Sequence, residues 1–312
     1  MVMDRKPEWL KVRAPGGERY THIKETLRRY DLHTVCEEAR CPNVGECWGD
    51  GTATIMILGD VCTRGCRFCA VTTGNPRGAY DPREPEHTGR TIAAMGLQYV
   101  VITMVDRDDM LDGGAGHVAE TLRAIRTLSP EILIEALLGD FSGNLDDVAT
   151  AVVEGRPDVF AHNVETVERL QRTVRDARCS MEKSLAVLRH SKAVSPETYT
   201  KSSIMVGLGE TREEVLETMR ALREVDVDVL TLGQYLRPSP KHHELVRYWS
   251  PEEFEDLRVQ GMAMGFRYVA SGPLVRSSYK AAEAFLRGQL MKTTGPVETT
   301  AARPHRSLPV LP

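Results

Sequence analysis

The sequence lacks several features that define common classes of protein. It has no apolar run approaching the ~18 residues that a membrane span requires. Its formal net charge of −4 gives no basic surface for nucleic acid, so DNA or RNA is not expected as the main partner. Its start, MVMDRKPEWLKV, resembles neither an apolar secretion signal nor an Arg- and Ser-rich transit leader. We therefore expect a cytoplasmic protein that does not bind membranes.

Cysteine is scarce but concentrated. Six of the seven cysteines form two triads: Cys36-x4-Cys41-x5-Cys47 and Cys62-x3-Cys66-x2-Cys69. Thiolates are the ligands of soft metals and iron–sulfur clusters, so three of them in one short segment indicate one inorganic centre. Neither triad has a fourth cysteine. Each predicted centre therefore keeps one corner that no cysteine fills, and an open corner is where chemistry can occur.

Two other uses of cysteine fit this pattern less well. Disulfide frameworks belong to small secreted proteins, whereas this chain shows no signal peptide and is long enough to build a core. Structural zinc sites have four ligands, usually in C-x2-C pairs, and only Cys66 and Cys69 have that spacing. Iron–sulfur ligation in a reducing compartment is favoured, with disulfides and zinc as the alternatives.

Beyond residue 50 the sequence alternates between short apolar strands and amphipathic helices. The strands are nearly continuous in Val, Ile, Leu and Met, which is typical of strands buried on both faces of a parallel sheet. Six strands are predicted: Ala53–Leu58, Tyr99–Val105, Ile132–Leu138, Asp158–Val164, Ser202–Gly207 and Val229–Tyr235. Six repeats are too few for an eight-stranded barrel, so we expect an α/β fold with a partial (βα)6 TIM-like barrel.

The two ends of the chain depart from this alternation. Residues 1–50 contain the first cysteine triad and are predicted to form an N-terminal extension that binds a cluster. The barrel is expected over residues 51–240. Residues 241–292 form a C-terminal extension with a helix over Pro251–Gly265 and a seventh strand over Tyr268–Leu274. The tail, residues 293–312, is rich in Pro and Thr and is predicted to be disordered.

The second triad follows the first predicted strand directly, in GDVCTRGCRFCAV. In parallel α/β folds the functional loops lie at the carboxyl ends of the strands. Gly59 and Gly65 are expected to allow the backbone angles of a tight loop, and Phe68 can shield a cluster from water. Three thiolates there can hold three irons of a cubane cluster and leave the fourth iron open.

A C-x3-C-x2-C segment in this context resembles the radical S-adenosylmethionine (SAM) enzymes. Further segments are similar to the lipoyl synthase family and occur in its order from about Glu8 to Ala282: CEEARCPNVGECW, CTRGCRFC, VDRDDMLDGGAGH, NVETV, MVGLGET, TLGQYL, MGF and RSSYKA. The resemblance implies a sulfurtransferase that inserts two sulfur atoms, at C6 and C8 of an octanoyl chain. That chain is carried on a lysine of a lipoyl-carrier domain. The sequence departs from the family pattern at Gly139, where proline is expected.

The resemblance also implies the cofactors, which are SAM and two [4Fe–4S] clusters. The catalytic cluster, whose open iron binds SAM, is expected on Cys62, Cys66 and Cys69. The auxiliary cluster, which donates its sulfur, is expected on Cys36, Cys41 and Cys47. Its fourth ligand is a serine of Arg276-Ser277-Ser278-Tyr279, and we assign Ser278 with Ser277 as the alternative. By itself, a Ser pair before a helix is typical of an N-cap.

Other polar residues near strand ends are weaker candidates. The expected SAM contacts are Gly113 and Gly114 after the second strand, and Asn163 and Glu165 at the end of the fourth. A plain loop and a helix N-cap are the respective alternatives. Further residues of interest are Glu135, which needs a buried partner, Arg175 and Arg178 as possible substrate contacts, Cys179 without an assigned role, and the loop residues His242 and His243.

The expected partners follow from the resemblance. They are octanoylated lipoyl-carrier domains (E2 subunits of 2-oxoacid dehydrogenases and the glycine cleavage H protein), a flavodoxin- or ferredoxin-type reductant, and an iron–sulfur carrier that rebuilds the auxiliary cluster. Two other functions stay open. One is another radical SAM enzyme, such as a biotin-synthase-like or methylthiotransferase-like protein. The other is a non-enzymatic iron–sulfur carrier, although a simple electron carrier needs no six-stranded barrel.

Overall fold

The computed structural model describes residues 6–10, 16–29, 33–38, 41, 43–49 and 52–278. The predicted disordered tail, Tyr279 and the remainder of the predicted C-terminal extension lie outside the described residues. Within the described part, no helix has the length and apolar character needed to cross a bilayer.

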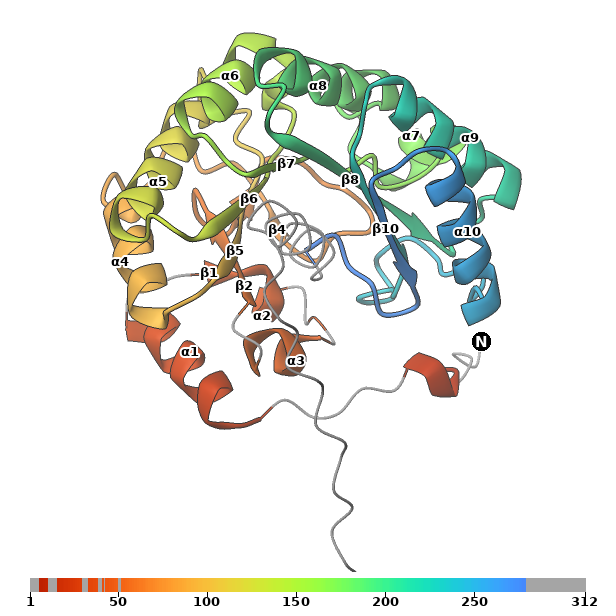
Figure 1. Cartoon of the computed structure of the whole chain (residues 1–312), viewed down its shortest axis with the longest axis horizontal. Coiled ribbons are helices and arrows are strands. Elements are labelled where there is room, and N and C mark those ends of the chain that lie inside the picture. The colour runs from red at the N-terminus through yellow and green to blue at the C-terminus, as the bar shows by residue number, and fades with distance from the viewer. Residues whose placement is uncertain are drawn as a thin grey trace, which may run out of the picture.

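An open barrel forms the centre of the molecule (Figure 1). Its sheet has eight strands in the order β1-β2-β5-β6-β7-β8-β9-β10. All neighbours pair in parallel except β1, which is antiparallel to β2. The strands are β1 (His33–Thr34), β2 (Thr52–Ile57), β5 (Tyr99–Met104), β6 (Leu133–Leu137), β7 (Val159–Ala161), β8 (Tyr199–Val206), β9 (Val229–Gln234) and β10 (Tyr268–Gly272). The predicted partial α/β barrel is confirmed, including the seventh strand at its far edge.

Helices cover the outer face of the sheet (Figure 1). The long ones are α4 (Glu84–Met95), α5 (Ala115–Leu128), α8 (Met181–Val194), α9 (Arg212–Glu224) and α10 (Pro251–Ala263). Shorter ones are η2 (Phe141–Gly143), α6 (Leu145–Ala149) with its π-helical continuation η3 (Thr150–Glu154), η4 (Glu168–Leu170) and α7 (Gln171–Val174). Local sequence determines where two of these helices begin. Thr211 with Glu214 forms a capping box before α9, and Ser250 with Glu253 forms one before α10.

The described residues of the N-terminal extension contain four helical elements, which are η1 (Glu8–Leu10), α1 (Glu18–Arg29), α2 (Val35–Glu38) and α3 (Val44–Gly49). Of these, α2 and α3 contact β2, and α1 contacts α3 and α4. Ile23 and Leu27 of α1 and Trp48 of α3 are buried and join the core that also contains the outer face of β2. Full burial of each such side chain contributes about 1.5–3 kcal/mol. The first cysteine triad is thereby held against the barrel.

Side chains alternate between the two faces of the barrel strands. Outward residues such as Ile102, Ile134 and Phe160 pack in the core shared with the helices, whereas Tyr99 and Val159 belong to a separate cluster. Polar residues are also buried on the strands. The Lys201 ammonium lies 2.7 and 2.8 Å from the two oxygens of Glu135, and the Tyr99 hydroxyl donates to the same carboxylate at 2.5 Å. The predicted need of Glu135 for a buried partner is confirmed.

Most strand boundaries lie within one or two residues of their predictions, and two differ by three residues. β7 ends at Ala161, although an apolar strand was expected to Val164, because the Val164 N–H donates to the Ser202 side-chain hydroxyl at 3.2 Å instead of to a β8 carbonyl. Regular pairing with β8 is restored only as an isolated bridge between Glu165 and Ile204. β8 begins at Tyr199, three residues before the expected start at Ser202. Lys201 hid this start, since its charge is tolerated in a strand only because Glu135 neutralises it.

Candidate active site

A reversal of the chain directly after β2 begins the segment that bears the second cysteine triad, here called the cluster loop (residues 58–80). Leu58 and Gly59 both adopt left-handed φ values, 67° and 89°. The Glu84 carboxylate accepts the Leu58 N–H at 2.8 Å, and Arg107 donates to the Leu58 carbonyl at 3.1 Å. The expectation for Gly59 is confirmed. That for Gly65 is wrong, because its φ is not positive.

The cluster loop contains a short parallel pair of strands, β3 (Val61–Cys62) and β4 (Thr72–Thr73). It covers a cavity of about 240 Å³ at the carboxyl ends of the barrel strands. Cys62, Cys66 and Cys69 line this cavity, as does Phe68. The three thiols of the triad therefore border one space, at the end of the barrel where the sequence predicts chemistry.

The pKa of each thiol of the second triad is raised above its ordinary value. For Cys62 burial is the main cause, the nearby Asp106 carboxylate adds to it, and the pKa reaches about 11. For Cys66 a hydrogen bond with Cys179 is the largest cause, and it lowers the pKa of Cys179 to about 7. A cationic metal centre would reverse this preference, because a ligating thiol is deprotonated. Metal binding here is thus expected to release protons.

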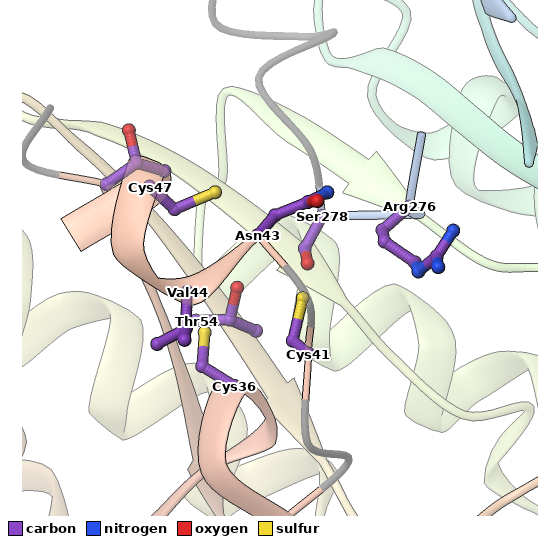
Figure 2. Close-up of a pocket in the computed structure, with 9 residues that line it drawn as sticks. Cys36, Cys41, Asn43, Val44, Cys47, Thr54, Arg276 and Ser278 are labelled. Carbon is purple, nitrogen blue, oxygen red and sulfur yellow. The ribbon is translucent and has the colours of Figure 1, made fainter. Parts of the chain in front are cut away.

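A smaller pocket holds the first triad (Figure 2). Cys36, Cys41 and Cys47 line it together with residues from the far end of the described chain, Arg276 and Ser278. Burial raises the pKa of Cys36 to about 11. The two chain ends are joined by Asn43, whose side-chain amide donates to the Leu274 carbonyl at 2.6 Å, across 231 positions of sequence.

Ser278 lies where the two sites meet. It lines both the small pocket and the large cavity, whereas Ser277 lines the large cavity alone. Thr54 on β2 also borders both. The residue after Ser278 lies outside the described chain, so the N-cap alternative for this serine pair stays open.

The donor sets suit iron–sulfur clusters and a polar cofactor. All seven cysteines are thiols, with no disulfide between them. Across the described chain, no three Cys, His, Asp or Glu side chains stand close enough to share one metal ion. A cubane cluster does not need such proximity, since each thiolate binds a different iron. Three buried polar atoms at the cavity lack a hydrogen-bond partner within the described chain: Asp140 Oδ2, Asn163 Oδ1 and Arg175 Nε. Such atoms favour a polar ligand.

The predicted SAM contacts fall into two groups. Asn163 and Glu165 line the cavity, joined by a hydrogen bond of 3.1 Å, and burial raises the pKa of Glu165. Asn163 caps no helix here, because η4 begins after Val167. Gly113 and Gly114 do not line the cavity and instead pack toward Phe141 and Leu58. Their contact with SAM stays a prediction.

Several cavity residues were missed or undervalued from the sequence. Arg64, Asp106, Asp140 and His162 line the cavity, and so does Cys179, which had no assigned role. Arg175 lines it, while Arg178 does not and forms ion pairs with Asp108 and Asp176 instead. The acidic run VDRDD was the available signal, since so many charges after a buried strand require partners.

The loop residues His242 and His243 contact the cluster loop. The His242 Nε2 atom lies 3.0 Å from the Cys69 carbonyl oxygen, and the His243 N–H donates to the Arg67 carbonyl at 2.7 Å. Both contacts are to backbone carbonyl groups. The loop after β9 therefore closes over the end of the cysteine triad.

Comparisons with known proteins agree with this architecture. A model of the radical SAM superfamily matches residues 56–222. The fold is similar to the crystal structure of methylornithine synthase (PylB), with a TM-score of 0.53 at 15% identity over 91% of this chain and 95% of that chain. The open barrel with a cysteine triad after its first parallel strand is that of a radical SAM enzyme.

The relatives narrow this class to one family. A model of the N-terminal domain of lipoyl synthase matches residues 2–41. The lipoyl synthase of Sorangium cellulosum is 62% identical over 90% of this chain and 79% of its own length. That of Anaeromyxobacter dehalogenans is 57% identical over 94% of this chain and 99% of its own length, and the chloroplastic enzyme of Arabidopsis thaliana is 57% identical over 91% and 73%. The chain belongs to the lipoyl synthase family.

Proposed function

We propose that the large cavity holds the [4Fe–4S] cluster that binds SAM and that the small pocket holds the auxiliary [4Fe–4S] cluster. As a member of its family, the chain is a radical SAM sulfurtransferase that inserts sulfur at C6 and C8 of a protein-bound octanoyl-lysine. In this proposal, the ligands of the first cluster are Cys62, Cys66 and Cys69. Those of the auxiliary cluster are Cys36, Cys41, Cys47 and Ser278.

The observation that carries this division is the position of Ser278. Ser278 borders both thiol-lined spaces. This supports a short distance between the substrate carbon that loses hydrogen in the large cavity and the auxiliary cluster that gives sulfur in the small pocket. A hydroxyl is also a weaker ligand for iron than a thiolate, because iron–sulfur clusters favour soft sulfur donors. Such a ligand suits a cluster that must give up its sulfur.

Each group of side chains then has a distinct task. When bound, the catalytic cluster and SAM supply the carbon radical that removes hydrogen, and the auxiliary cluster supplies the sulfur. Asn163 and Glu165 offer a donor and acceptors for the polar groups of SAM. Phe68 and Met56 line the same cavity with apolar surface, which would limit the access of water once the cofactors are bound. A dry site matters because a reactive radical must meet its substrate before solvent.

The substrate and partners are part of the proposal. We infer that the octanoyl-lysine arrives on a lipoyl-carrier domain, such as an E2 subunit or the glycine cleavage H protein. A flavodoxin- or ferredoxin-type protein supplies electrons, and an iron–sulfur carrier restores the auxiliary cluster after turnover. Thiolate ligation requires a reducing compartment, and we place the protein in the cytoplasm.

Anaerobic turnover with an octanoyl-lysine peptide, SAM and a reductant tests the proposal. We expect 5′-deoxyadenosine together with thiolated peptide, and about eight irons per reconstituted chain. Cleavage of SAM without any thiolated peptide would contradict the reaction. About four irons per chain would contradict the two-cluster assignment.

Replacement of one cysteine from each triad separates the two sites. Cys36→Ala should abolish peptide thiolation and leave SAM cleavage largely intact, because only the auxiliary cluster is lost. Cys62→Ala should abolish both activities. If Cys36→Ala also stopped SAM cleavage, the roles of the two triads would be misassigned.

A further inference from the structure

We propose that Arg64, between Cys62 and Cys66, is a positioning residue that fixes this part of the cluster loop to the barrel through Asp108 and Asp140. The inference rests on the proposed role of the Cys62, Cys66 and Cys69 thiolates as cluster ligands. It concerns a side chain that does not itself ligate iron.

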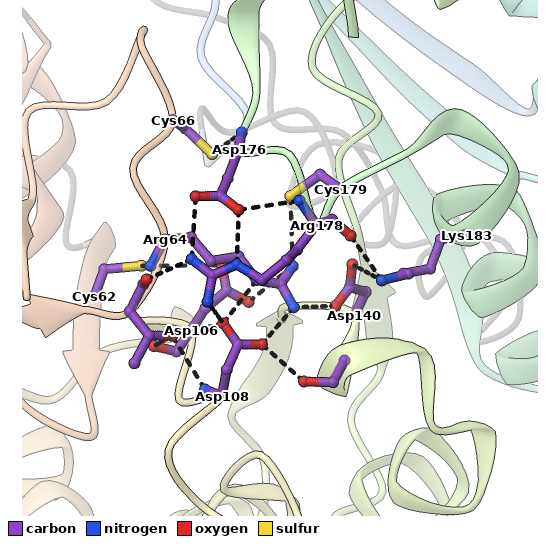
Figure 3. Close-up of polar contacts among 12 residues, drawn as sticks. Cys62, Arg64, Cys66, Asp106, Asp108, Asp140, Asp176, Arg178, Cys179 and Lys183 are labelled. Carbon is purple, nitrogen blue, oxygen red and sulfur yellow. Dashed lines mark hydrogen bonds and ion pairs between the residues drawn. The ribbon is translucent and has the colours of Figure 1, made fainter. Parts of the chain in front are cut away.

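The Arg64 guanidinium lies between the carboxylates of Asp108 and Asp140 (Figure 3). Arg64 is only 4% exposed. Its Nη2 atom lies 2.6 Å from Asp140 Oδ1 and 2.8 Å from Asp108 Oδ1, and its Nε atom lies 3.1 Å from Asp108 Oδ2. Asp108 follows β5 and Asp140 follows β6. This forked contact holds the loop in position and orientation, as a single point charge would not.

Arg64 also donates hydrogen bonds to cysteine sulfur atoms. The Arg64 backbone N–H donates to Cys62 Sγ at 3.4 Å, and its Nη1 donates to Cys179 Sγ at 3.4 Å. On the other side, the Asp176 N–H donates to Cys66 Sγ at 3.3 Å, while its carboxylate accepts the Gly65 N–H at 2.8 Å. Groups around a metal site orient its ligands and change its affinity when they are removed.

Arg178 closes this network from the solvent side. It donates to Asp108 at 3.0 Å, to Asp176 at 2.8 Å and to the Thr63 carbonyl at 2.6 Å. The segment Thr63–Cys66 is thus bound to three separate loops of the barrel. Thermal motion of the loop would change the spacing between Cys62 and Cys66, and these contacts oppose it.

Charge balance is the competing explanation for Arg64. Asp140 is fully buried, its Oδ2 atom has no hydrogen-bond partner in the described chain, and the Lys183 ammonium is 4.0 Å away. Loss of Arg64 would leave this carboxylate without its main neutralising group, which destabilises any fold. A test must therefore separate neutralisation from positioning.

The experiment compares Arg64→Gln, Arg64→Lys and the pair Arg64→Gln/Asp140→Asn in the full-length, anaerobically reconstituted protein. Two quantities are measured: the rate at which a chelator removes iron, and the electron paramagnetic resonance spectrum of the reduced cluster with and without SAM. Arg90→Gln is the control, since Arg90 lies on the exposed face of α4 and pairs only with Glu86 among the described contacts. Replacing Cys36, Cys41 and Cys47 by Ala in every variant leaves only the cluster under test.

We expect Arg64→Gln to lose iron about 10–100-fold faster than the parent and to show an altered spectrum. Arg64→Lys should behave similarly, because lysine keeps the charge and loses the fork. The Arg64→Gln/Asp140→Asn pair should recover thermal stability without recovering iron retention. Recovery of both would overturn the proposal and leave Arg64 as a neutralising group alone, as would unchanged iron loss in Arg64→Gln.

Three further variants keep the outcome decisive. If Arg64→Gln does not fold, Asp108→Asn removes one of the two acceptor oxygens of the forked pair and leaves the Asp140 contact. It should speed iron loss more than Arg178→Gln, which removes only the Arg178 contacts with Asp108, Asp176 and the Thr63 carbonyl. The ligand assignment is tested apart from Arg64 by Cys62→Ala, which should bind no cluster at this site. A Cys62→Ala protein that kept its iron would contradict the proposed function, whatever Arg64 does.

Discussion

At the scale of single residues, the position of Ser278 separates two nearly equivalent assignments. Ser277 and Ser278 are adjacent and chemically identical, yet only Ser278 borders the pocket of the first cysteine triad. The two serines lie in a turn after β10, where adjacent side chains take different directions, so neighbours can line different spaces.

We predict that Ser278→Ala lowers peptide thiolation at least about tenfold while SAM cleavage continues, because a ligand of the auxiliary cluster is lost. Ser277→Ala is the matched control and should reduce thiolation much less. The measurement is the ratio of thiolated peptide to 5′-deoxyadenosine in single-turnover assays. Equal losses in the two variants would argue against Ser278 as the ligand.

The sequence predicts two cysteine triads as cluster ligands, and in the structure each triad lines one space. Their ligation of clusters stays a prediction. The sequence does not predict that Arg64 and Asp140 line the cavity, because a charged residue beside a cysteine motif gives no periodic signal. Whether these two residues form an ion pair depends on which loops lie side by side in the fold. Cys179 likewise belongs to no cysteine motif, and only the fold shows that its sulfur lies beside Arg64.

At the scale of elements, the start of α5 supports the start of the cluster loop. Gly114 precedes α5 with a φ of 89°, and a Cβ atom there would lie 2.5 Å from the buried Leu58 side chain. Leu58 is itself in a left-handed conformation at the end of β2. The left-handed Leu58 therefore packs directly against the left-handed Gly114, where only glycine leaves room for the leucine side chain.

We expect Gly114→Ala to be more destabilising than Gly96→Ala by about 1–3 kcal/mol, the usual cost of overpacking. Gly96 is a suitable control because it also has a positive φ, 59°, but a Cβ atom there would meet nothing within 4 Å. Both variants place a Cβ atom on a backbone with a positive φ, so the difference between their free energies of unfolding measures mainly the contact with Leu58. Chemical denaturation of the two variants measures it, and equal losses would refute the packing argument.

A second element-scale contact joins the two ends of the chain. The buried Asn43 side chain, just before α3, holds the Leu274 carbonyl just after β10. Its removal leaves that carbonyl without this donor, at a cost of about 1–3 kcal/mol.

Asn43→Ala should therefore raise hydrogen exchange in residues 274–278 and speed loss of iron from the auxiliary cluster. Asn144→Ala is the control, since it removes the N-cap of α6 and costs about 1 kcal/mol elsewhere in the molecule. Exchange measured by mass spectrometry separates them: unchanged protection of residues 274–278 in Asn43→Ala would mean that Asn43 does not hold this segment.

At the scale of the whole molecule, the open barrel explains where the second site lies. β1 and β10 are the edges of the sheet, and β2 is next to β1. The small pocket is lined by Thr52 and Thr54 of β2 and by Arg276 and Ser278, which follow β10. The opening between the sheet edges is thus where both chain extensions meet. A closed barrel would pair these edges and leave no such place.

The buried polar network also sets a dependence of global stability on pH. His162 donates from Nδ1 to the Leu138 carbonyl at 2.8 Å and accepts from the Ser184 hydroxyl at Nε2, 3.0 Å away. Burial lowers the pKa of His162 to about 4, whereas an unfolded histidine titrates near 6.5. Below about pH 6.5 the unfolded state gains a proton that the folded state refuses, so the free energy of unfolding falls as pH falls toward 4.

We predict that the free energy of unfolding of the parent falls by about 2 kcal/mol more than that of His162→Asn between pH 7 and pH 5. The parent must be compared with His162→Asn because Asp106 changes the stability of both proteins in the opposite direction. Burial raises the pKa of Asp106 to about 6, so the folded state takes up that proton first and gains stability over the same range. Denaturation curves at several pH values give the comparison, and parallel curves for the two proteins would exclude His162 as the cause.

The sequence alone determined the fold class, the two cysteine triads and the family, because these depend on local periodicity and on motifs read within short windows. The tertiary structure alone decided which serine reaches the first triad, which charges hold the second triad, and that Gly113 and Gly114 pack beneath Leu58 and Phe141 instead of lining the cavity. These facts depend on contacts between residues far apart in the chain, such as Asn43 with Leu274 and Arg64 with Asp140. Packing and burial in the folded protein determine which distant residues come into contact, and the spacing of a motif does not reveal them.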